Sequence, residues 1–89
     1  LGSSVENSLI AQGCVIEGHV ESSVLFTNVK IGENAEISEA VLMPNVEVGE
    51  GAKVYRAIVA DGVKIDAGCV VGDPKSEEIA VISKRVRSE

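Results

Sequence analysis

The chain has 89 residues, of which 45% are hydrophobic but only 2% aromatic, and its formal net charge is −6. This length makes one small domain. A negative net charge repels nucleic acid and anionic lipid, and the chain has no basic or aromatic stripe to offset it, so we exclude proteins that bind either of them. Fifteen Val and eight Ile against four Leu favour strands over helices, because a side chain branched at Cβ loses rotamer freedom in a helix.

The chain contains no apolar run of roughly 20 residues, the length that a membrane-spanning helix needs, and its first residues lack the pattern of a signal peptide. We therefore expect a soluble, cytoplasmic domain that does not associate with membranes. The sequence begins at Leu1 rather than at an initiator Met, and we expect it to be cut from a longer protein.

An apolar repeat with a spacing of four to six residues runs from Val5 to Val71. Its members are Val5, Ala11, Ile16, Val20, Phe26, Ile31, Ile37, Met43, Val48, Val54, Ala60, Ile65 and Val71. A second column of small or aliphatic residues follows three or four positions later: Leu9, Cys14, Val24, Val29, Ala35, Val41, Val46, Ala52, Ile58, Val63 and Cys69. Each run is as long as a short strand and lacks the continuous i, i+3, i+4, i+7 spacing of a helix. We expect both columns to point into a shared core.

Three hexads combine into a unit of 17 residues that repeats from Ile31 to Val48 to Ile65, and the unit from Ile16 to Ile31 is two residues shorter. Residues that tolerate a positive φ recur at one corner: Gly13, Asn28, Asn45 and Gly62. The period predicts a solenoid of about four coils, in which each strand pairs in parallel with the strand one coil later.

The repeat ends at Asp73-Pro74-Lys75, because proline has no N–H to donate to a ladder. We expect the apolar run at 79–82 to fold back and cap the last coil, and Ser83–Glu89 to be a frayed tail. The chain is thus divided into a repeat domain, 1–72, and a cap and tail, 73–89. No comparable segment covers the first coil at 1–5, so we expect a preceding domain or self-association to cover that end.

The hexads resemble those of the left-handed parallel β-helix, a triangular prism with three faces per coil. More particularly, the chain resembles the C-terminal domain of the bacterial glucose-1-phosphate adenylyltransferase family, or ADP-glucose pyrophosphorylases. The segments that carry the resemblance are Asn7-Ser8-Leu9-Ile10, Gly13-Cys14-Val15-Ile16-Glu17-Gly18, Val24-Leu25-Phe26, Val41-Leu42-Met43-Pro44, Val48-Gly49-Glu50-Gly51-Ala52 and Glu78-Ile79-Ala80-Val81-Ile82. The implied fold is all-β, a left-handed β-helix.

The resemblance implies a parent enzyme that uses Mg²⁺ to condense ATP with glucose 1-phosphate into ADP-glucose and pyrophosphate for glycogen synthesis, or a noncatalytic regulatory paralogue. In that family the chemistry belongs to an N-terminal nucleotidyltransferase domain with a Gly-rich loop. This chain has no such loop, since neither G-x-G-x-x-G after a strand nor a phosphate-loop Gly-Lys-Ser/Thr occurs.

The implied role is therefore that of an inactive domain that contributes subunit contacts and part of the allosteric control. Its partners would be its own N-terminal domain, which holds ATP and Mg²⁺, and further subunits of a homo- or hetero-oligomer. Three alternatives remain: a hexapeptide-repeat acyltransferase, the C-terminal domain of another sugar-nucleotide pyrophosphorylase, and a purely structural assembly module.

His19 is the only histidine, whereas a solenoid carbonic anhydrase would need three for its zinc ion. One His could act as general base in an acyltransferase. However, His19 falls in the shortened corner Glu17-Gly18-His19 and no long loop is present to build an acceptor pocket. We expect a corner residue or a domain contact.

Cys14 and Cys69 belong to no Cys-x-x-Cys or Cys/His pattern. We expect core thiols about 14 Å apart, beyond the ~7 Å between Cα atoms that a disulfide allows.

Four cations are expected to face outward: Lys30, Lys53, Arg56 and Lys64. Lys30, Glu47 and Lys64 align at one corner as a solvated charge ladder. A sharper hypothesis is that some of these cations bind an anionic effector, such as a sugar phosphate, at a domain boundary. Carboxylates at corners and outer faces are expected to be solvated surface: Glu33, Glu36, Glu39, Glu47 and Glu50. We assign no catalytic, cofactor-binding or metal-binding residue.

Overall fold

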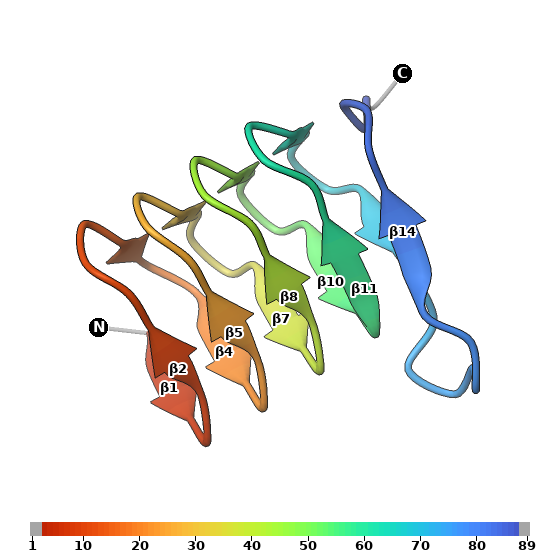
Figure 1. Ribbon diagram of the computed structural model, residues 1–89, viewed down its shortest axis with the longest axis horizontal. Coiled ribbons are helices and arrows are strands. Elements are labelled where there is room, and N and C mark those ends of the chain that lie inside the picture. The colour runs from red at the N-terminus through yellow and green to blue at the C-terminus, as the bar shows by residue number, and fades with distance from the viewer. Residues whose placement is uncertain (1–2, 88–89) are drawn as a thin grey trace.

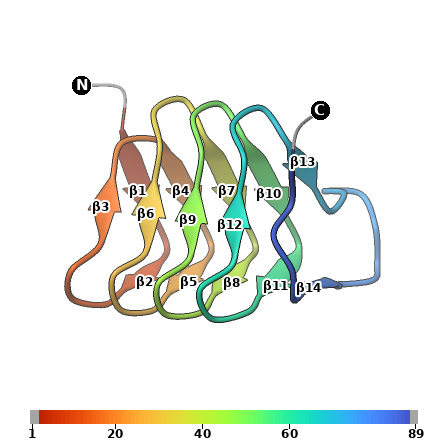
Figure 2. The same cartoon turned by 90° about the horizontal axis from the view of Figure 1, so that it is seen from above.

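The computed structural model describes residues 3–87, and within this range the chain forms short strands and no helix. The strands build three parallel sheets around a common axis, as Figures 1 and 2 show from two sides. Each coil contributes one strand to each sheet and then continues into the next coil. The predicted all-β solenoid of about four coils is confirmed.

The three sheets are named here A, B and C. Sheet A contains β1 (Ser4–Glu6), β4 (His19–Glu21), β7 (Glu36–Ser38), β10 (Lys53–Tyr55) and β13 (Val70–Val71). Sheet B contains β2 (Leu9–Ile10), β5 (Val24–Leu25), β8 (Val41–Leu42), β11 (Ala57–Val59) and β14 (Ala80–Ile82). Sheet C contains β3 (Val15–Ile16), β6 (Lys30–Ile31), β9 (Glu47–Val48) and β12 (Lys64–Ile65).

The strand register follows the predicted period. Ile31 pairs with Val48 one coil later, whereas Ile16 pairs with Ile31 across the shortened coil. The shortened corner brings Gly18 against the next coil, where an added Cβ would lie 2.5 Å from the carbonyl oxygen of Ala35. Glycine is therefore required at this close approach.

The predicted corner residues adopt a positive φ: Gly13 (81°), Asn28 (61°), Asn45 (67°) and Gly62 (75°). A second corner, between sheets A and B, also has positive φ values, although its residues are not glycine: Asn7 (49°), Ser22 (51°), Glu39 (52°) and Arg56 (47°). At this corner only Arg56 separates β10 from β11. One left-handed residue thus suffices to turn the chain there.

The buried core is aliphatic, as the composition predicts. Its large members form one inward row per sheet: Val20, Ile37, Val54 and Val71 on A, Leu25, Leu42 and Val59 on B, and Ile31, Val48 and Ile65 on C. Small or β-branched residues fill the corners between these rows: Ser23, Val29, Ala35, Ala40, Val46, Ala52, Ala57 and Val63. The two aromatic side chains, Phe26 and Tyr55, are not among the buried residues.

The predicted register is wrong on sheet B by one residue. Three residues assigned to the inward row lie on the surface or half-buried instead: Phe26, Met43 and Ala60. Their preceding neighbours, Leu25, Leu42 and Val59, are at most 1% exposed. For the same reason the second column points outward there, at Val24, Val41 and Ile58, while Ser23, Ala40 and Ala57 are buried.

The error on sheet B has a physical cause. A shift of one residue exchanges the two faces of a strand, and an apolar pattern fixes the register only where one face is polar. On sheet B both faces are apolar, as in Val41-Leu42-Met43. The predicted inward row, Ile37, Met43 and Val48, has its five-residue step after Met43. In the observed row Leu42 replaces Met43, so the five-residue step lies between Ile37 and Leu42, across the A–B corner.

The C-terminal segment runs back over the last coil. After β13 the chain leaves the solenoid as a loop, visible in Figure 2. β14 then pairs in parallel with β11, with Ile82 in register with Val59. Val86 forms a bridge with Ile65, and Arg85 forms an ion pair with Asp66 at 2.9 Å. The expectation of a frayed tail from Ser83 is therefore wrong as far as Val86. The expectations for Leu1–Gly2 and Ser88–Glu89 lie outside the described residues.

Among residues 3–87 no helix is long and apolar enough to span a membrane.

Candidate functional site

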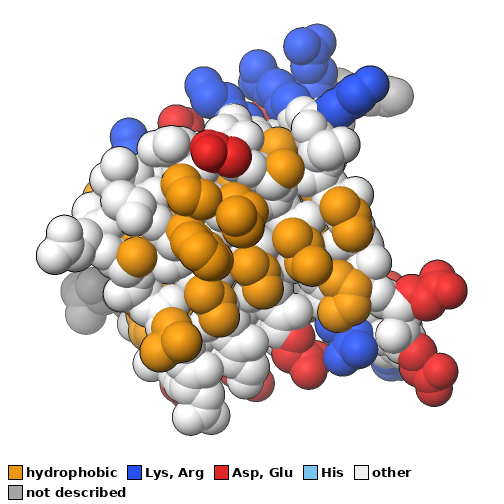
Figure 3. All heavy atoms as spheres, in the orientation of Figure 1, with side chains coloured by type: hydrophobic (Ala, Val, Ile, Leu, Met, Phe, Trp, Pro, Cys, Tyr) orange, Lys and Arg blue, Asp and Glu red, His pale blue; other side chains and the backbone are white. Residues whose placement is uncertain are grey.

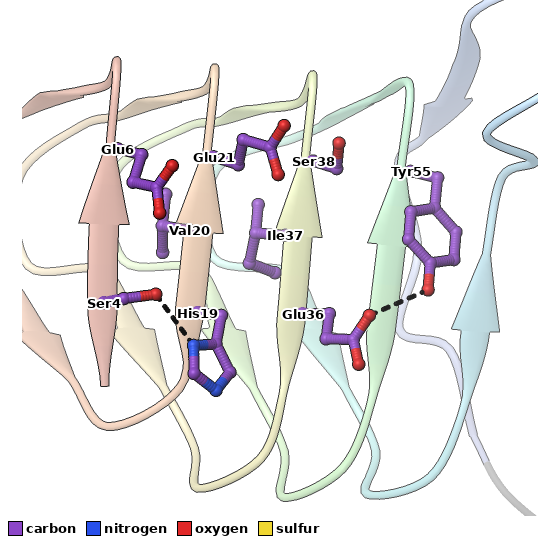
Figure 4. Close-up of a pocket in the computed structure, with 9 residues that line it drawn as sticks. All are labelled: Ser4, Glu6, His19, Val20, Glu21, Glu36, Ile37, Ser38 and Tyr55. Atoms are coloured by element: carbon purple, nitrogen blue, oxygen red, sulfur yellow. Dashed lines mark hydrogen bonds between the residues drawn. The ribbon is translucent and has the colours of Figure 1, made fainter. Parts of the chain in front are cut away.

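A polar groove runs over the outer surface of sheet A and has a volume of about 350 Å³. Ser4 and His19 lie at one side of the groove, where Ser4 Oγ and His19 Nδ1 are 2.8 Å apart. At the other side, Tyr55 Oη on β10 donates a hydrogen bond to Glu36 Oε1 on the neighbouring strand β7 at 3.2 Å (Figure 4). The lining residues are Ser4, Glu6, His19, Val20, Glu21, Glu36, Ile37, Ser38 and Tyr55.

Strand parity places His19 in this groove. It is the first residue of β4 and points outward because its neighbour Val20 fills the core. Stacking adds the other groups, since His19 pairs in register with Ser4 on one side and with Glu36 on the other. The structure thus places His19 just after the predicted corner, at the start of a strand.

The Tyr55 hydroxyl stays neutral more readily than a free phenol. Partial burial raises the pKa of Tyr55, and the negative charge of Glu36 and the hydrogen bond to it raise that pKa further. The protonated phenol is therefore a hydrogen-bond donor to Glu36 throughout the neutral pH range.

The Ser4–His19 pair has the residue types of a nucleophile and its base. Acyl transfer would also need N–H donors aimed at the developing oxyanion. The backbone N–H of Ser4 donates to Gly18 O at 3.1 Å, and that of His19 donates to Ala35 O at 2.8 Å. Both donors are thus committed to the solenoid ladder.

Both cysteines are free thiols, which confirms the prediction that they form no disulfide. They pack against the core but are only half-buried, because they belong to the first and last coils and lack a neighbouring coil on one side. The Cys14 thiol donates to the carbonyl oxygen of Phe26 at 3.1 Å. Within residues 3–87 no three His, Cys, Asp or Glu side chains are grouped so that they could hold a metal ion.

Sheet C carries the predicted charge column. Glu47 pairs in register with Lys30 on one side and with Lys64 on the other, which confirms the alignment. The three residues lie within strands β6, β9 and β12 rather than at a corner. The column therefore forms part of the outer face of sheet C.

The C-terminal tail adds cations that the sequence pattern did not associate with this column. Val86 N–H donates to Lys64 O at 2.9 Å, which brings Arg85 and its neighbours beside Lys64. Figure 3 shows Lys and Arg side chains gathered at the C-terminal edge of the molecule. We call Lys64, Lys84, Arg85 and Arg87 the cap cations. Arg85 is paired with Asp66.

Lys53 and Arg56 lie away from this cluster. Lys53 is exposed on β10, in register with Glu36. Arg56 turns the corner between sheets A and B, where its Nη1 atom lies 3.4 Å from Glu39 Oε2. The glutamates singled out in the sequence lie at corners and outer positions, as expected: Glu33, Glu36, Glu39, Glu47 and Glu50.

The outer surface of sheet B is apolar, in contrast to sheets A and C. One row crosses all five strands in register: Leu9, Val24, Val41, Ile58 and Val81. Leu9 is 72%, Ile58 39% and Val81 71% exposed. Phe26 and Met43 flank this row at the adjoining corner, and Figure 3 shows the hydrophobic side chains that cover this side of the molecule. We call these seven residues the apolar face.

A notch of about 250 Å³ lies at the first-coil end of the apolar face. It is lined by Leu9, Ile10, Ala11, Val24, Leu25 and Phe26. Sequence reasoning missed both the face and the notch because it directed Phe26 and Val24 into the core. The signal was nevertheless present, since strands covered on both sides have continuous apolar runs such as Val24-Leu25-Phe26.

Three short parallel strands per coil around an aliphatic core define a hexapeptide-repeat β-solenoid. The sequence model described as GlmU-like, C-terminal hexapeptide matches residues 2–86, and the chain belongs to this family. The resemblance found in the sequence is thereby confirmed at the level of the repeat domain.

Several relatives have names from glycogen synthesis. The chain is 58% identical over 38 residues to a glucose-1-phosphate adenylyltransferase of Mycoplasma mobile and 51% identical over 35 residues to that of Fusobacterium nucleatum. It is 62% identical over 34 residues to the glycogen biosynthesis protein GlgD of Geobacillus stearothermophilus. These matches cover 38–43% of this chain, which spans about a tenth of the length of each relative.

Proposed function

We propose that this chain is the hexapeptide domain of a glucose-1-phosphate adenylyltransferase or of its GlgD-type paralogue, and that it serves assembly and regulation rather than chemistry. The observation that carries this proposal is the identity of 51–62% to relatives with these names. The parent protein would act in the cytoplasm on ATP and glucose 1-phosphate, and a preceding nucleotidyltransferase domain would bind the nucleotide and Mg²⁺.

The noncatalytic role of the chain is supported by the geometry around His19. The backbone N–H groups of Ser4 and His19 both donate to carbonyl oxygens of the solenoid ladder. The acyltransferase alternative needs His19 as a general base beside an acceptor and oxyanion donors. The geometry therefore favours the assembly role.

The regulatory role is supported by the cap cations. They stand out on a chain whose net charge is −6, and Lys64 and Arg85 lie on adjacent segments. A cluster of this kind attracts multiply charged anions. We assign to it the binding of an anionic effector of the sugar phosphate class, where the domain meets another part of the assembly.

The test is an assay of pyrophosphate release from ATP and glucose 1-phosphate. The longer polypeptide that encodes this domain is expected to produce ADP-glucose, or, if it is the paralogue, to alter the activity of a catalytic partner. The 89-residue chain alone is expected to be inactive. Turnover by the chain alone would overturn the noncatalytic role, and an encoded polypeptide without a nucleotidyltransferase domain would overturn the parent assignment.

A further inference from the structure

The groove over the outer surface of sheet A has the dimensions of a ligand site. Its volume of about 350 Å³ lies within the range of sites that hold small molecules. It crosses four neighbouring strands, β1, β4, β7 and β10, and three steps of about 4.8 Å give it a length of about 14 Å. The groove therefore suits an elongated ligand better than a compact one.

Strand pairing arranges the polar side chains of the groove in two rows. Within each row the residues lie in register on successive strands (Figure 4): Ser4, His19 and Glu36 in the first row, and Glu6, Glu21, Ser38 and Tyr55 in the second. Each coil adds one residue to each row, so a polar group recurs about every 4.8 Å along the groove. A ligand with a polar unit repeated along its length can therefore meet both rows at several strands.

The lining residues argue against anions, apolar molecules and simple cations as ligands. Three of these residues are glutamates and none is Lys or Arg, so an anion would be repelled. An apolar molecule would remove water from the carboxylates without replacing their hydrogen bonds. Within residues 3–87 no group of side chains could hold a metal ion. An ammonium group would gain little, because the three glutamates are exposed and ion pairs in contact with water are weak.

The hydrogen-bonding groups of the groove suit a ligand rich in hydroxyls. Ionised carboxylates only accept hydrogen bonds, whereas the Ser38 hydroxyl both donates and accepts. Hydroxyl groups on a ligand can satisfy both kinds of partner, and an ammonium group can only donate. The hydrogen bond from Tyr55 Oη to Glu36 holds the phenol ring beside these groups. The ring offers an apolar surface on which the C–H face of a sugar can pack.

We propose that the groove over sheet A binds a linear oligosaccharide, which lies across the strands along the two polar rows. Hydroxyl groups of the sugar donate to the carboxylates of Glu21 and Glu36, and one sugar ring packs on the phenol ring of Tyr55. This inference goes beyond the proposed function and does not depend on it. It assigns a carbohydrate-binding site to a domain for which only assembly and regulation are proposed.

The test is a titration of the 89-residue chain with maltotetraose and, separately, with cellotetraose. Calorimetry measures the affinity, and amide chemical shifts in NMR spectra locate the site. We expect at least one of the two sugars to bind, with the largest shifts in β4, β7 and β10. Glu21→Gln should weaken binding about fivefold, because a neutral amide accepts a weaker hydrogen bond than a carboxylate. Tyr55→Ser should weaken it at least as much, whereas Tyr55→Phe keeps the ring and should retain most of the affinity.

Glu47→Gln is the matched control, because it makes the same change on the outer side of sheet C, and it should leave the affinity unchanged. The urea midpoint of each variant separates lost binding from lost folding. The inference is overturned if neither sugar binds, if the shifts lie outside sheet A, or if Glu21→Gln binds as tightly as the unaltered chain. Spermidine is titrated in parallel, and its binding in the groove without binding of either sugar would identify a cation site instead.

Discussion

The register of sheet B can be tested with one pair of alanine variants, Leu42→Ala and Met43→Ala. Leu42 is 0% exposed and stands between Leu25 and Val59, its partners on the adjacent strands. Those partners are fixed by the ladder and cannot move into the space that the leucine leaves. We therefore expect Leu42→Ala to cost about 3 kcal/mol, within the range for a buried leucine whose cavity does not collapse.

Met43→Ala is the matched control, because it removes a similar volume from the next residue. Met43 is half-buried at the corner beside the apolar face, so its truncation should cost about 1 kcal/mol or less. The free energy of unfolding is measured by urea denaturation, with unchanged m-values as the check that both variants unfold from the same state. For a domain of this size the leucine variant should also melt about 12–24 °C lower.

The register predicted from the apolar spacing, with Met43 inside, implies the opposite order of costs. A Met43→Ala variant that is destabilised as much as Leu42→Ala would refute the register described here. The same result would also remove the apolar face, because Val41 would then point into the core.

Three further predictions concern a corner, a titration and the open end of the solenoid. Gly62 has φ +75°, and a Cβ added to it would meet no atom within 4 Å. Gly62→Asn should therefore leave the melting temperature nearly unchanged, whereas Gly62→Val should cost about 1–2 kcal/mol of stability. Equal melting temperatures of the two variants would contradict a left-handed corner. The pKa of Tyr55 is raised from its ordinary value of 10.0, so its contribution to stability is present below pH 10 and is lost as the pH rises through the folded-state pKa. Absorbance titration should show that pKa moving down in Glu36→Gln, and an unchanged pKa would exclude the Glu36 contact. Val5 is 46% and Ile10 37% exposed on the first coil, and light scattering of the 89-residue chain should therefore show association at high concentration; a strictly monomeric mass would count against an open end that needs a cover.

The sequence predicted the inward rows of sheets A and C because each of these sheets has one apolar and one mainly polar face. Ile37 and Val48 alternate with charged or polar neighbours, so only one register buries them. The corners were predictable for a different reason, since Asn28 and Gly62 tolerate the positive φ that the turn needs. Period and turn chemistry together thus determined most of the fold.

Other features have no periodic signal. The tail pairs with the solenoid through one bridging residue, Val86. A single residue forms no pattern in the sequence from which its partner could be predicted. The groove was missed because Ser4, His19 and Tyr55 are far apart in the chain and meet only when the coils are stacked. Once the offsets between coils are known, the meeting of Ser4 with His19 follows directly from the register.

The error on sheet B and the apolar outer face of that sheet have the same cause. A half-covered strand has an alternating pattern that fixes its register, whereas a strand covered on both sides does not. In a solenoid, a face on which two successive positions are apolar in every coil is therefore expected to be covered from outside as well as from inside. Leu42→Ala tests the inner side of this face. Because Leu42 points inward and Ile58 on the adjacent strand points outward, a large cost at Leu42 would support the register that leaves Ile58 on the surface.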